Sequence, residues 1–326
     1  MREKSSRLAL EYFLRNKRKR DKMITDIVKR ILKDPPYLFE LFMRTKAGGV
    51  LISDRKAISF LYNRRFNRKI DFENPLTFNE KILVLSLLDR KPIYTTMVDK
   101  YNSKQFIEDR IGSGYTPKNL GTWKATSEID FESLPDRYAL KCNHDSGSVV
   151  VCDNRRPTSR ELAMLDRHLK SNYFYFSREW PYKNIHPIIF AEEYISSPSI
   201  SEGGLVDYKV FCFDGKPYMI CVISNRSEKA KLSYLSLDWQ MIDARQRYDN
   251  HDVLPKCPKN KGLMLEIAKK LSEGIPFLRV DFFEDTNEKL FVGELTFLPS
   301  SGLIPFQPDS FDYELGKMID IEKFKN

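Results

Sequence analysis

The sequence predicts an α+β fold, and three features of the 326-residue chain lead to this prediction. Apolar residues recur at helical spacing through residues 5–46. From about residue 115 the pattern changes to strands that alternate with helices. Residues 277–302 are typical of two apolar strands joined by a polar turn. A hydrophobic content of 41% suffices for a large core, which we expect to form two or three lobes.

Residues 1–70 are predicted to form a basic helical extension. The run Lys17–Arg20 interrupts its apolar pattern, and the chain carries a net charge of +9. Two interpretations remain open. The extension could lie on the anionic inner face of a membrane, where each basic residue contributes about 1 kcal/mol, or it could be a helical cap with solvated charges. We expect no nucleic-acid partner, because charge is the only nucleic-acid-binding feature of the chain.

Residues 71–135 are predicted to be a helical linking region that leads into the strands. Thr77 has the residue type of an N-cap for a helix in this region. In a later predicted helix, Leu263, Ile267 and Leu271 share one face. The helices that we expect from periodicity and end signals are Leu76–Leu88, Ser159–Asn172 and Gly262–Gly274.

The two strands near the end of the chain carry polar residues at alternating positions. Side chains two positions apart share one face of a strand, so Arg279 projects together with Asp281. Glu294 and Thr296 share a face for the same reason. The turn at residues 284–288 would bring the two pairs side by side. Two carboxylates beside a guanidinium suit Mg²⁺ held against nucleotide phosphates; the alternative is a half-exposed hairpin with charges on its wet face.

This hairpin resembles the carboxy-terminal metal signature of the ATP-grasp superfamily, in which an Asp, a Glu thirteen positions later and a nearby Asn share Mg²⁺. Asp281 and Glu294 match, and Thr296 stands where the Asn is expected. A threonine hydroxyl is a poorer ligand than an amide carbonyl. The resemblance implies ATP and Mg²⁺ as cofactors and two α+β lobes that sandwich ATP, at residues 136–190 and 191–326.

Two further segments are similar to the phosphate-binding parts of that superfamily. Val98–Lys104 resembles the first helix of the nucleotide lobe and implies that Lys100 faces a phosphate. Tyr138–Val151 resembles the second lysine strand and the small-residue flap that follows it. In this resemblance Lys141 contacts the α-phosphate and the adenine side of the nucleotide.

The predicted flap runs from His144 to Ser148 and would fold over the β- and γ-phosphates. Ser146, Gly147 and Ser148 are small enough to let backbone N–H groups approach an anion closely. His144 is a candidate contact to substrate or phosphate; the alternative is a solvent-exposed loop histidine.

Ile188–Ile195 resembles the hinge strand between the lobes. The resemblance implies that its backbone pairs with the edge of adenine. Glu192 or Glu193 would recognise the adenine amino group, and Tyr194 and Ile195 complete the nucleotide-binding segment.

Val206–Gly215 is the last segment of the series, a strand with an acid and a base two positions apart. Asp207 is a candidate for ribose or amine contacts and Lys209 for the γ-phosphate. Arg279 could also hold an acylphosphate. Arg226 is a further candidate for anion binding, although a surface arginine in a turn is the alternative.

A narrower resemblance is to the TupA-like ATP-grasp family of bacterial surface-polysaccharide loci, over roughly residues 70–315. Members of that family are often labelled glycosyltransferases. Asp145 departs from the pattern, because a glycine is more usual there, and would make the flap stiffer and more acidic. The phrases that carry the resemblance are Asn74–Lys81, Leu140–Gly147, Arg178–Asn184 and Gly293–Phe297.

The resemblance implies a ligase that uses ATP to join an amino acid or other amine to a sugar carboxylate, such as a uronic acid, through an acylphosphate. Two alternatives remain open. A polysaccharide glycosyltransferase is one, although no Asp-x-Asp nucleotide-sugar motif occurs in the chain. A kinase that phosphorylates a sugar or lipid hydroxyl is the other, because it would bind ATP and Mg²⁺ in the same way.

The composition indicates a cytoplasmic enzyme, with peripheral contact at the inner face of the membrane as an open possibility. The chain has no run of eighteen apolar residues, and its start lacks an apolar signal core. The cysteines have no zinc-ligand spacing and are expected to be reduced. They are Cys142, Cys152, Cys212, Cys221 and Cys257.

Overall fold

The structure, a computed structural model, describes residues 21–22, 25–196, 206–224 and 229–325. The chain divides into two compact units, and the boundary lies between Ser53 and Asp54.

The first unit is helical where the structure describes it. It contains α2 (Pro36–Met43) and α3 (Lys46–Leu51), and residues 25–33 are also helical. The Thr45 hydroxyl accepts a backbone hydrogen bond at 3.0 Å and caps α3. The basic run Lys17–Arg20 lies outside the described residues, so the membrane prediction for it stays a prediction.

The second unit contains the remaining helices and all the described strands. None of the helices that the structure describes is both long and apolar enough to cross a bilayer. The α-helices are α4 (Asp54–Phe66), α5 (Phe78–Leu88), α6 (Ile93–Val98), α7 (Ser103–Ile111), α8 (Ser159–Leu169), α9 (Phe174–Ser177), α10 (Lys261–Ser272) and α11 (Asp309–Lys317). Short 3₁₀ turns occur at Thr126–Glu128, Trp180–Tyr182, Pro299–Gly302 and Glu322–Phe324.

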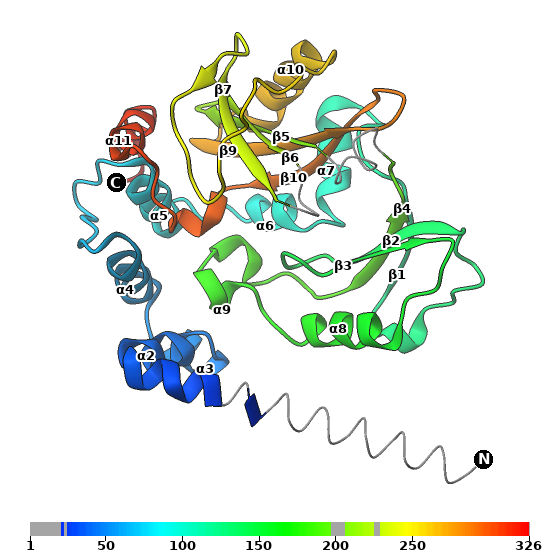
Figure 1. The fold of residues 1–326 in the computed structure, drawn as a ribbon, viewed down its shortest axis with the longest axis horizontal. Helices are drawn as coiled ribbons and strands as arrows, with labels where there is room; N and C mark the ends of the chain where they lie inside the picture. The colour runs from blue at the N-terminus through cyan, green and yellow to red at the C-terminus, as the bar shows by residue number, and fades with distance from the viewer. Residues whose placement is uncertain (1–20, 23–24, 197–205, 225–228, 326) are drawn as a thin grey trace. The chain divides into compact units, whose positions relative to one another are not determined.

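The smaller sheet of the described residues has four antiparallel strands in the order β1-β4-β2-β3 (Figure 1). Its first strand comes from the segment 71–135 that we predicted to be helical and linking, and its β4 passes the predicted lobe boundary at residue 190. Helix α8 packs against it, because Leu165 shares an apolar cluster with Leu140. The strands are β1 (Asn119–Trp123), β2 (Arg137–Cys142), β3 (Val149–Asp153) and β4 (Ile189–Glu193).

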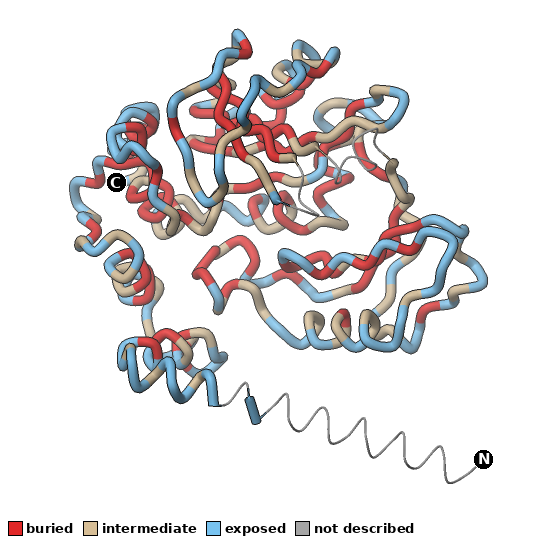
Figure 2. Tube along the Cα trace, viewed as in Figure 1, coloured by how far each residue is buried: buried red, intermediate tan, exposed pale blue. Residues whose placement is uncertain are grey.

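The larger sheet has six strands among the described residues, in the order β10-β9-β5-β6-β7-β8, and every neighbouring pair is antiparallel. Figure 2 shows that buried residues are concentrated along these strands. The strands are β5 (Asp207–Phe213), β6 (Lys216–Ser224), β7 (Lys231–Ser236), β8 (Met241–Ile242), β9 (Phe277–Glu284) and β10 (Leu290–Thr296).

Each face of the larger sheet is covered by helices. On one face Ile267 of α10 packs in a cluster with Val280 of β9. On the other face Phe78 of α5 and Leu315 of α11 pack with Phe277. Burial of a large apolar side chain stabilises the fold by about 1.5–3 kcal/mol. The sheet is therefore a packed support for the polar side chains that β5, β9 and β10 carry.

Three predicted helices occur in the structure as α5, α8 and α10, with small differences in their ends and faces. Thr77 caps α5 and forms a capping box with Glu80, which confirms that prediction. Helix α8 ends at Leu169, three residues before the predicted Asn172. In α10 Leu263 is 37% exposed, so it adds less to the buried face than Ile267 and Leu271. The buried row of α10 is Met264, Ile267, Ala268 and Leu271.

A β-bulge controls the register of the predicted hairpin. Val292 pairs with Phe282, but Glu294 pairs with Asp281, so Gly293 is an extra residue on β10. Val292 and Glu294 are two positions apart and would share a face in a regular strand. The bulge instead leaves Val292 in the apolar core and turns Glu294 toward the face of Asp281.

Candidate functional site

The polar end of the larger sheet holds a buried carboxylate between two cations. Asp281 Oδ1 accepts from Arg279 Nε at 2.6 Å, and Asp281 Oδ2 accepts from Arg279 Nη2 at 2.7 Å. Lys209, opposite Asp281 on β5, also contacts Oδ2. Burial alone would raise the pKa of Asp281, but the two adjacent cations outweigh it and hold that pKa below its usual value. Asp281 is therefore ionised and oriented.

Glu294 lies beside this group but is held less tightly. Its Oε2 is 3.9 Å from Arg279 Nη2, and its Oε1 is 3.6 Å from Lys100 Nζ. The side chain is 29% exposed. Thr296 differs, because its hydroxyl accepts from Arg279 Nη2 at 3.1 Å. The four residues predicted to converge on one face of the hairpin do converge there.

These residues fit Mg²⁺ as a pair of carboxylates rather than as a complete cage. In the described part of the chain, no three His, Cys, Asp or Glu side chains gather as a ready-made metal site. Mg²⁺ often takes one or two carboxylates and obtains its other ligands from water and phosphate oxygens. Glu294 is the better-placed ligand, because Arg279 already donates to both oxygens of Asp281. Thr296 is the weakest of the predicted ligands.

A cavity of about 350 Å³ opens in front of this cluster. Ligand pockets commonly begin near this size. Its wall includes Ser146 and Tyr173 from the region of the smaller sheet and Lys209 from the larger sheet. The full lining is Ser146, Tyr173, Phe176, Glu179, Tyr182, Lys209, Phe211, Cys221, Ile223, Leu232, Tyr234, Gln246, Arg247, Tyr248, Arg279, Glu294, Thr296, Leu298, Pro299, Ser300, Ser301 and Ile304.

Lys100 reaches this site from a turn. Helix α6 ends at Val98 and α7 begins at Ser103, so the prediction of Lys100 within a helix was wrong. The Lys100 ammonium contacts the backbone carbonyl of Asp145 and approaches Glu294. A lysine in this position can face an anion bound in the cavity.

A second buried carboxylate lies in the smaller sheet, again between two cations. Glu192 contacts Lys141 of β2 and accepts from Lys104 of α7 at 2.7 Å. Lys104 Nζ also donates to the Asn119 side chain at 2.6 Å. Burial would raise the pKa of Glu192, but the two lysines lower it. Burial lowers the pKa of Lys104, despite the nearby Glu192.

The backbone of β4 was predicted to pair with the edge of adenine, and over most of the strand this prediction was wrong. Strand β4 lies between β1 and β2, so its backbone pairs on both sides through Glu193. Glu193 turns to β1, where its side chain accepts from Lys118 N at 3.0 Å. Only the segment after the strand remains for adenine. There the Tyr194 ring lies 4.5 Å from the Arg137 guanidinium, and Ile195 follows it without strand pairing.

The predicted phosphate flap is a buried, hydrogen-bonded loop for much of its length. His144 is 2% exposed, so the alternative of a solvent-exposed loop histidine was wrong. Its Nε2 lies 3.1 Å from the carbonyl oxygens of His168 and Ser171, which fixes it in the protein rather than toward a ligand. A role for His144 in substrate or phosphate binding therefore finds no support in this arrangement.

The rest of the loop divides into a fixed part and an open part. Asp145 contacts His168 and the Ser148 hydroxyl, so its carboxylate is held away from solvent. Ser148 Oγ also accepts from the Cys142 backbone at 3.1 Å. Ser146 and Gly147 are exposed, and Gly147 has a positive φ of 97°. Of the three predicted small residues, these two can present backbone N–H groups to an anion.

Asp207 and Arg226 are the two remaining predicted site residues. Asp207 opens β5 opposite Ile223, two positions before Lys209. Arg226 lies outside the described residues, so its predicted role stays a prediction.

Glu179 is a charged residue of the cavity that sequence reasoning did not single out. It is 6% exposed, and its Oε1 accepts from Ser177 Oγ at 2.8 Å and from Ser301 Oγ at 3.0 Å. Burial raises the pKa of Glu179 to about 7, although the two serine hydroxyls oppose this rise. Ser301 has a left-handed backbone with φ of 58°, uncommon for a non-glycine residue.

Comparison with known proteins identifies the family of the chain. A family model described as TupA-like ATP-grasp matches residues 80–320. The chain belongs to the TupA-like ATP-grasp family. This confirms the predicted resemblance and the α+β ATP-grasp fold. A search of curated proteins finds no match to this TupA-like ATP-grasp chain.

Solved structures similar to this TupA-like ATP-grasp protein share little sequence with it. An L-amino acid ligase from Bacillus licheniformis is 13% identical, with 78% of this chain and 57% of that chain covered and a TM-score of 0.46. A D-alanine–D-alanine ligase from Bacillus anthracis complexed with ATP is 17% identical, with 69% and 63% covered and a TM-score of 0.39. The ATP-grasp ligase PsnB is 11% identical, with 66% and 58% covered and a TM-score of 0.37. This chain therefore spans 57% to 63% of the lengths of these structures.

The missed residues lie in segments that carried the two family resemblances. Glu179 lies inside the segment Arg178–Asn184 that carried the family resemblance. Lys104 ends the segment Val98–Lys104 that was matched through Lys100. Both segments are visible in the sequence, but nothing in their local pattern marks Glu179 or Lys104 as a buried, charged residue.

Proposed function

We propose that this TupA-like ATP-grasp protein is an ATP-dependent carboxylate–amine ligase. In this proposal it joins an amino acid or another amine to a sugar carboxylate, such as a uronic acid, in the synthesis of a bacterial surface polysaccharide. The observation that carries the proposal is the pairing of Asp281 and Glu294 across the hairpin, beside Lys209 and Arg279 and in front of a cavity of about 350 Å³. Family membership supports the use of ATP.

The two charged clusters suggest how ATP is held. Lys104, Lys141 and Glu192 would lie at the nucleoside end, with the segment after β4 beside adenine. At the phosphate end, Lys100 and the open backbone of Ser146 and Gly147 would face the β- and γ-phosphates. Phosphoryl transfer requires positioning and charge stabilisation more than covalent help from the protein, and both clusters supply these.

Glu294 and Asp281 would hold Mg²⁺, which when bound neutralises charge on the transferring phosphoryl group. Arg279 and Lys209 orient Asp281 and place positive charge on the cavity wall. The acceptor carboxylate would enter the cavity, take the γ-phosphoryl group of ATP and become an acylphosphate. An amine then displaces phosphate. Holding the two reactants together lowers the entropic part of the barrier.

The fate of the γ-phosphate tests the ligase proposal. We expect ADP and inorganic phosphate in equal amounts, and only when a methyl uronoside and an L-amino acid are both present in a screen of such pairs. Hydroxylamine, a small nucleophile, should replace the amino acid and yield a hydroxamate of the uronoside.

Two outcomes contradict the proposal. A stable phosphorylated hydroxyl on the acceptor, without hydroxamate, would instead identify a kinase. Turnover of UDP-sugars without ATP would identify a glycosyltransferase. Membrane contact of the basic extension and a cytoplasmic location remain separate proposals, which this assay does not address.

A further inference from the structure

The segment that carries Glu179 is anchored by the residues on either side of it. Arg178 has a left-handed backbone with φ of 61°, and its buried guanidinium lies 3.5 Å from Asp54. The Trp180 ring lies 5.8 Å from the guanidinium of Arg90, which itself donates to Asp54 at 2.7 Å. These contacts fix the segment, and Glu179 lines the cavity.

The two oxygens of the Glu179 carboxylate have different surroundings. Both serine hydroxyls, from Ser177 and Ser301, donate to Oε1. In the part of the chain that the structure describes, Oε2 receives no hydrogen bond. A buried carboxylate ordinarily has partners for both oxygens. One oxygen is thus available for a ligand in the cavity.

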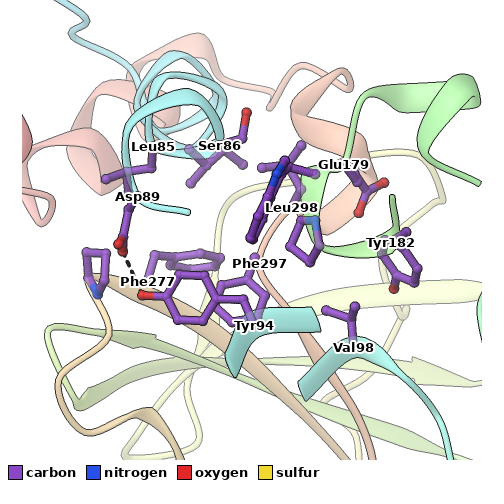
Figure 3. Close-up of a pocket in the computed structure, with 14 residues that line it drawn as sticks. Leu85, Ser86, Asp89, Tyr94, Val98, Glu179, Tyr182, Phe277, Phe297 and Leu298 are labelled. Carbon is purple, nitrogen blue, oxygen red and sulfur yellow. Dashed lines mark hydrogen bonds between the residues drawn. The ribbon is translucent and has the colours of Figure 1, made fainter. Parts of the chain in front are cut away.

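Glu179 also borders a second, smaller pocket of about 40 Å³, which is mostly apolar (Figure 3). Figure 3 shows Glu179 and Tyr182 on one side of this pocket, with Leu298 and Phe297 close by. On the opposite side Tyr94 donates to Asp89 at 2.6 Å. Glu179 thus lies between this mostly apolar pocket and the larger cavity, which also contains Arg279 and Glu294.

We propose that Glu179 Oε2 is the proton acceptor for the amine substrate in the cavity of about 350 Å³. This inference rests on the proposed ligase function and adds a residue to it. The amine is a primary ammonium compound, such as an amino acid, that must lose a proton before it can attack. A neutral hydroxyl or amide at position 179 could bind an ammonium group, but it could not take this proton.

The ammonium group of the amine transfers one proton to Glu179 Oε2, which frees the nitrogen lone pair. That lone pair forms the C–N bond to the acylphosphate carbon. The bond between this carbon and the bridging oxygen breaks, and the electron pair leaves with phosphate. The second N–H proton goes to the departing phosphate, and Glu179 later releases its proton to water.

The electrostatic surroundings are consistent with this role. Burial raises the pKa of Glu179 to about 7, the two serine hydroxyls lower it, Glu294 raises it and Arg279 lowers it. Tyr173 and Tyr182 also face the cavity, and burial raises both of their pKa values, so they stay neutral. A general base is most effective when its pKa lies near the working pH.

The experiment compares two nucleophiles in Glu179→Gln. The two substrates are the methyl uronoside and the L-amino acid that together give the fastest ADP release in the screen above. Hydroxylamine is largely unprotonated near neutral pH and needs no base to attack. We expect Glu179→Gln to lower the rate of amide formation by about 10²-fold or more. Its rate of hydroxamate formation should stay within a few-fold of the wild-type rate. The glutamine carbonyl can still accept both serine hydroxyls, so the fold should be retained.

Two further measurements sharpen the test. The wild-type amide rate should rise with pH through about 7, whereas the hydroxamate rate should not follow this rise. Glu179→Asp, which keeps a retracted carboxylate, should recover part of the amide rate. The matched control is Glu132→Gln, because Glu132 is exposed and pairs with Arg156 on the surface; it should behave as wild type with both nucleophiles.

Equal loss of both reactions in Glu179→Gln would overturn the inference, because a structural role would affect them alike. So would an unchanged amide rate. Absence of hydroxamate from the wild-type protein would instead contradict the ligase function itself, and the inference would fall with it. The wild-type and variant results therefore separate the two failures.

Discussion

Two buried carboxylates in this protein are each held between two cations, and the two sites differ in the kind of cation. Glu192 in the smaller sheet lies between Lys104 and Lys141. Asp281 in the larger sheet lies between Lys209 and Arg279. In both sites the cations outweigh burial and lower the pKa of the carboxylate. The carboxylates are therefore equivalent in charge, but their partners are not.

The difference lies in whether the cations can release a proton. Burial lowers the pKa of Lys104, so this lysine loses its proton more readily than an exposed lysine does. Burial acts in the same direction on Arg279, but Asp281 outweighs it and raises the pKa of Arg279. A guanidinium stays charged in proteins. The site in the larger sheet thus keeps a fixed positive charge next to the cavity, whereas the site in the smaller sheet can adjust its charge.

The largest expected effect comes from removing each carboxylate. In Asp281→Asn, Arg279 would stay charged, buried and without its counter-ion, and we expect the free energy of unfolding to fall by about 3–5 kcal/mol. In Glu192→Gln, Lys104 can lose its proton, so the loss should be about 1–3 kcal/mol. Urea denaturation of both variants measures this difference.

The exposed pair of Glu132 provides the control, and Glu132→Gln should change stability by less than about 0.5 kcal/mol. Equal losses in Asp281→Asn and Glu192→Gln would show that the type of cation does not matter.

The next effect concerns activity at the larger sheet. Glu294 is partly exposed, and its nearest cation in the described chain is 3.6 Å away, so it contributes little to folding. We expect Glu294→Gln to lower ATP turnover by roughly 10²-fold and to change stability by less than about 0.5 kcal/mol. ADP release at saturating Mg²⁺, together with urea denaturation, tests both parts. Wild-type turnover in this variant would show that the hairpin is only structural.

The smallest effect is the pH dependence that the two sites share. A carboxylate with a lowered pKa in the folded state stabilises the protein fully above the unfolded pKa, near 4 for Asp and Glu. That contribution is lost as pH falls through the lower folded pKa. The difference in the free energy of unfolding between wild type and Asp281→Asn should therefore become smaller below about pH 4. The same holds for the difference between wild type and Glu192→Gln. A gap that stays constant down to pH 2 would disagree with this explanation.

The sequence predicted that the four polar side chains of the hairpin converge, because the determining pattern is local. Arg279 and Asp281 are two positions apart, and a short polar turn joins their strand to β10. The choice between Lys100 and Lys104 could not be made in this way. Lys104 is distinguished by its contact with Glu192, 88 positions away in the chain, and no local pattern reports such a contact.

Burial was the second property that local patterns could not supply. His144 looked like a loop histidine, but the carbonyl groups that surround it lie on the segment around His168, 24 positions later. Glu179 looked like one charged residue of a turn, yet Ser301 contacts it from 122 positions away. Apolar periodicity predicts which elements form, whereas the surroundings of a polar side chain depend on how distant elements meet.

The bulge at Gly293 makes the protein unequally sensitive to changes in length. Residues added to the turn at 285–289 would lengthen the loop and leave the strand faces unchanged, since loops accept insertions at small entropic cost. Loss of Gly293 would place Glu294 directly after Val292, and adjacent residues of a regular strand point to opposite faces. Val292 would then stay in the core and Glu294 would stay opposite Asp281. Loss of Phe291 with the bulge kept would instead move Leu290 out of the core, because Leu290 would take the position opposite Phe283. A single codon deletion at the bulge would therefore spare both the core and the carboxylate, whereas the same deletion two residues earlier would not.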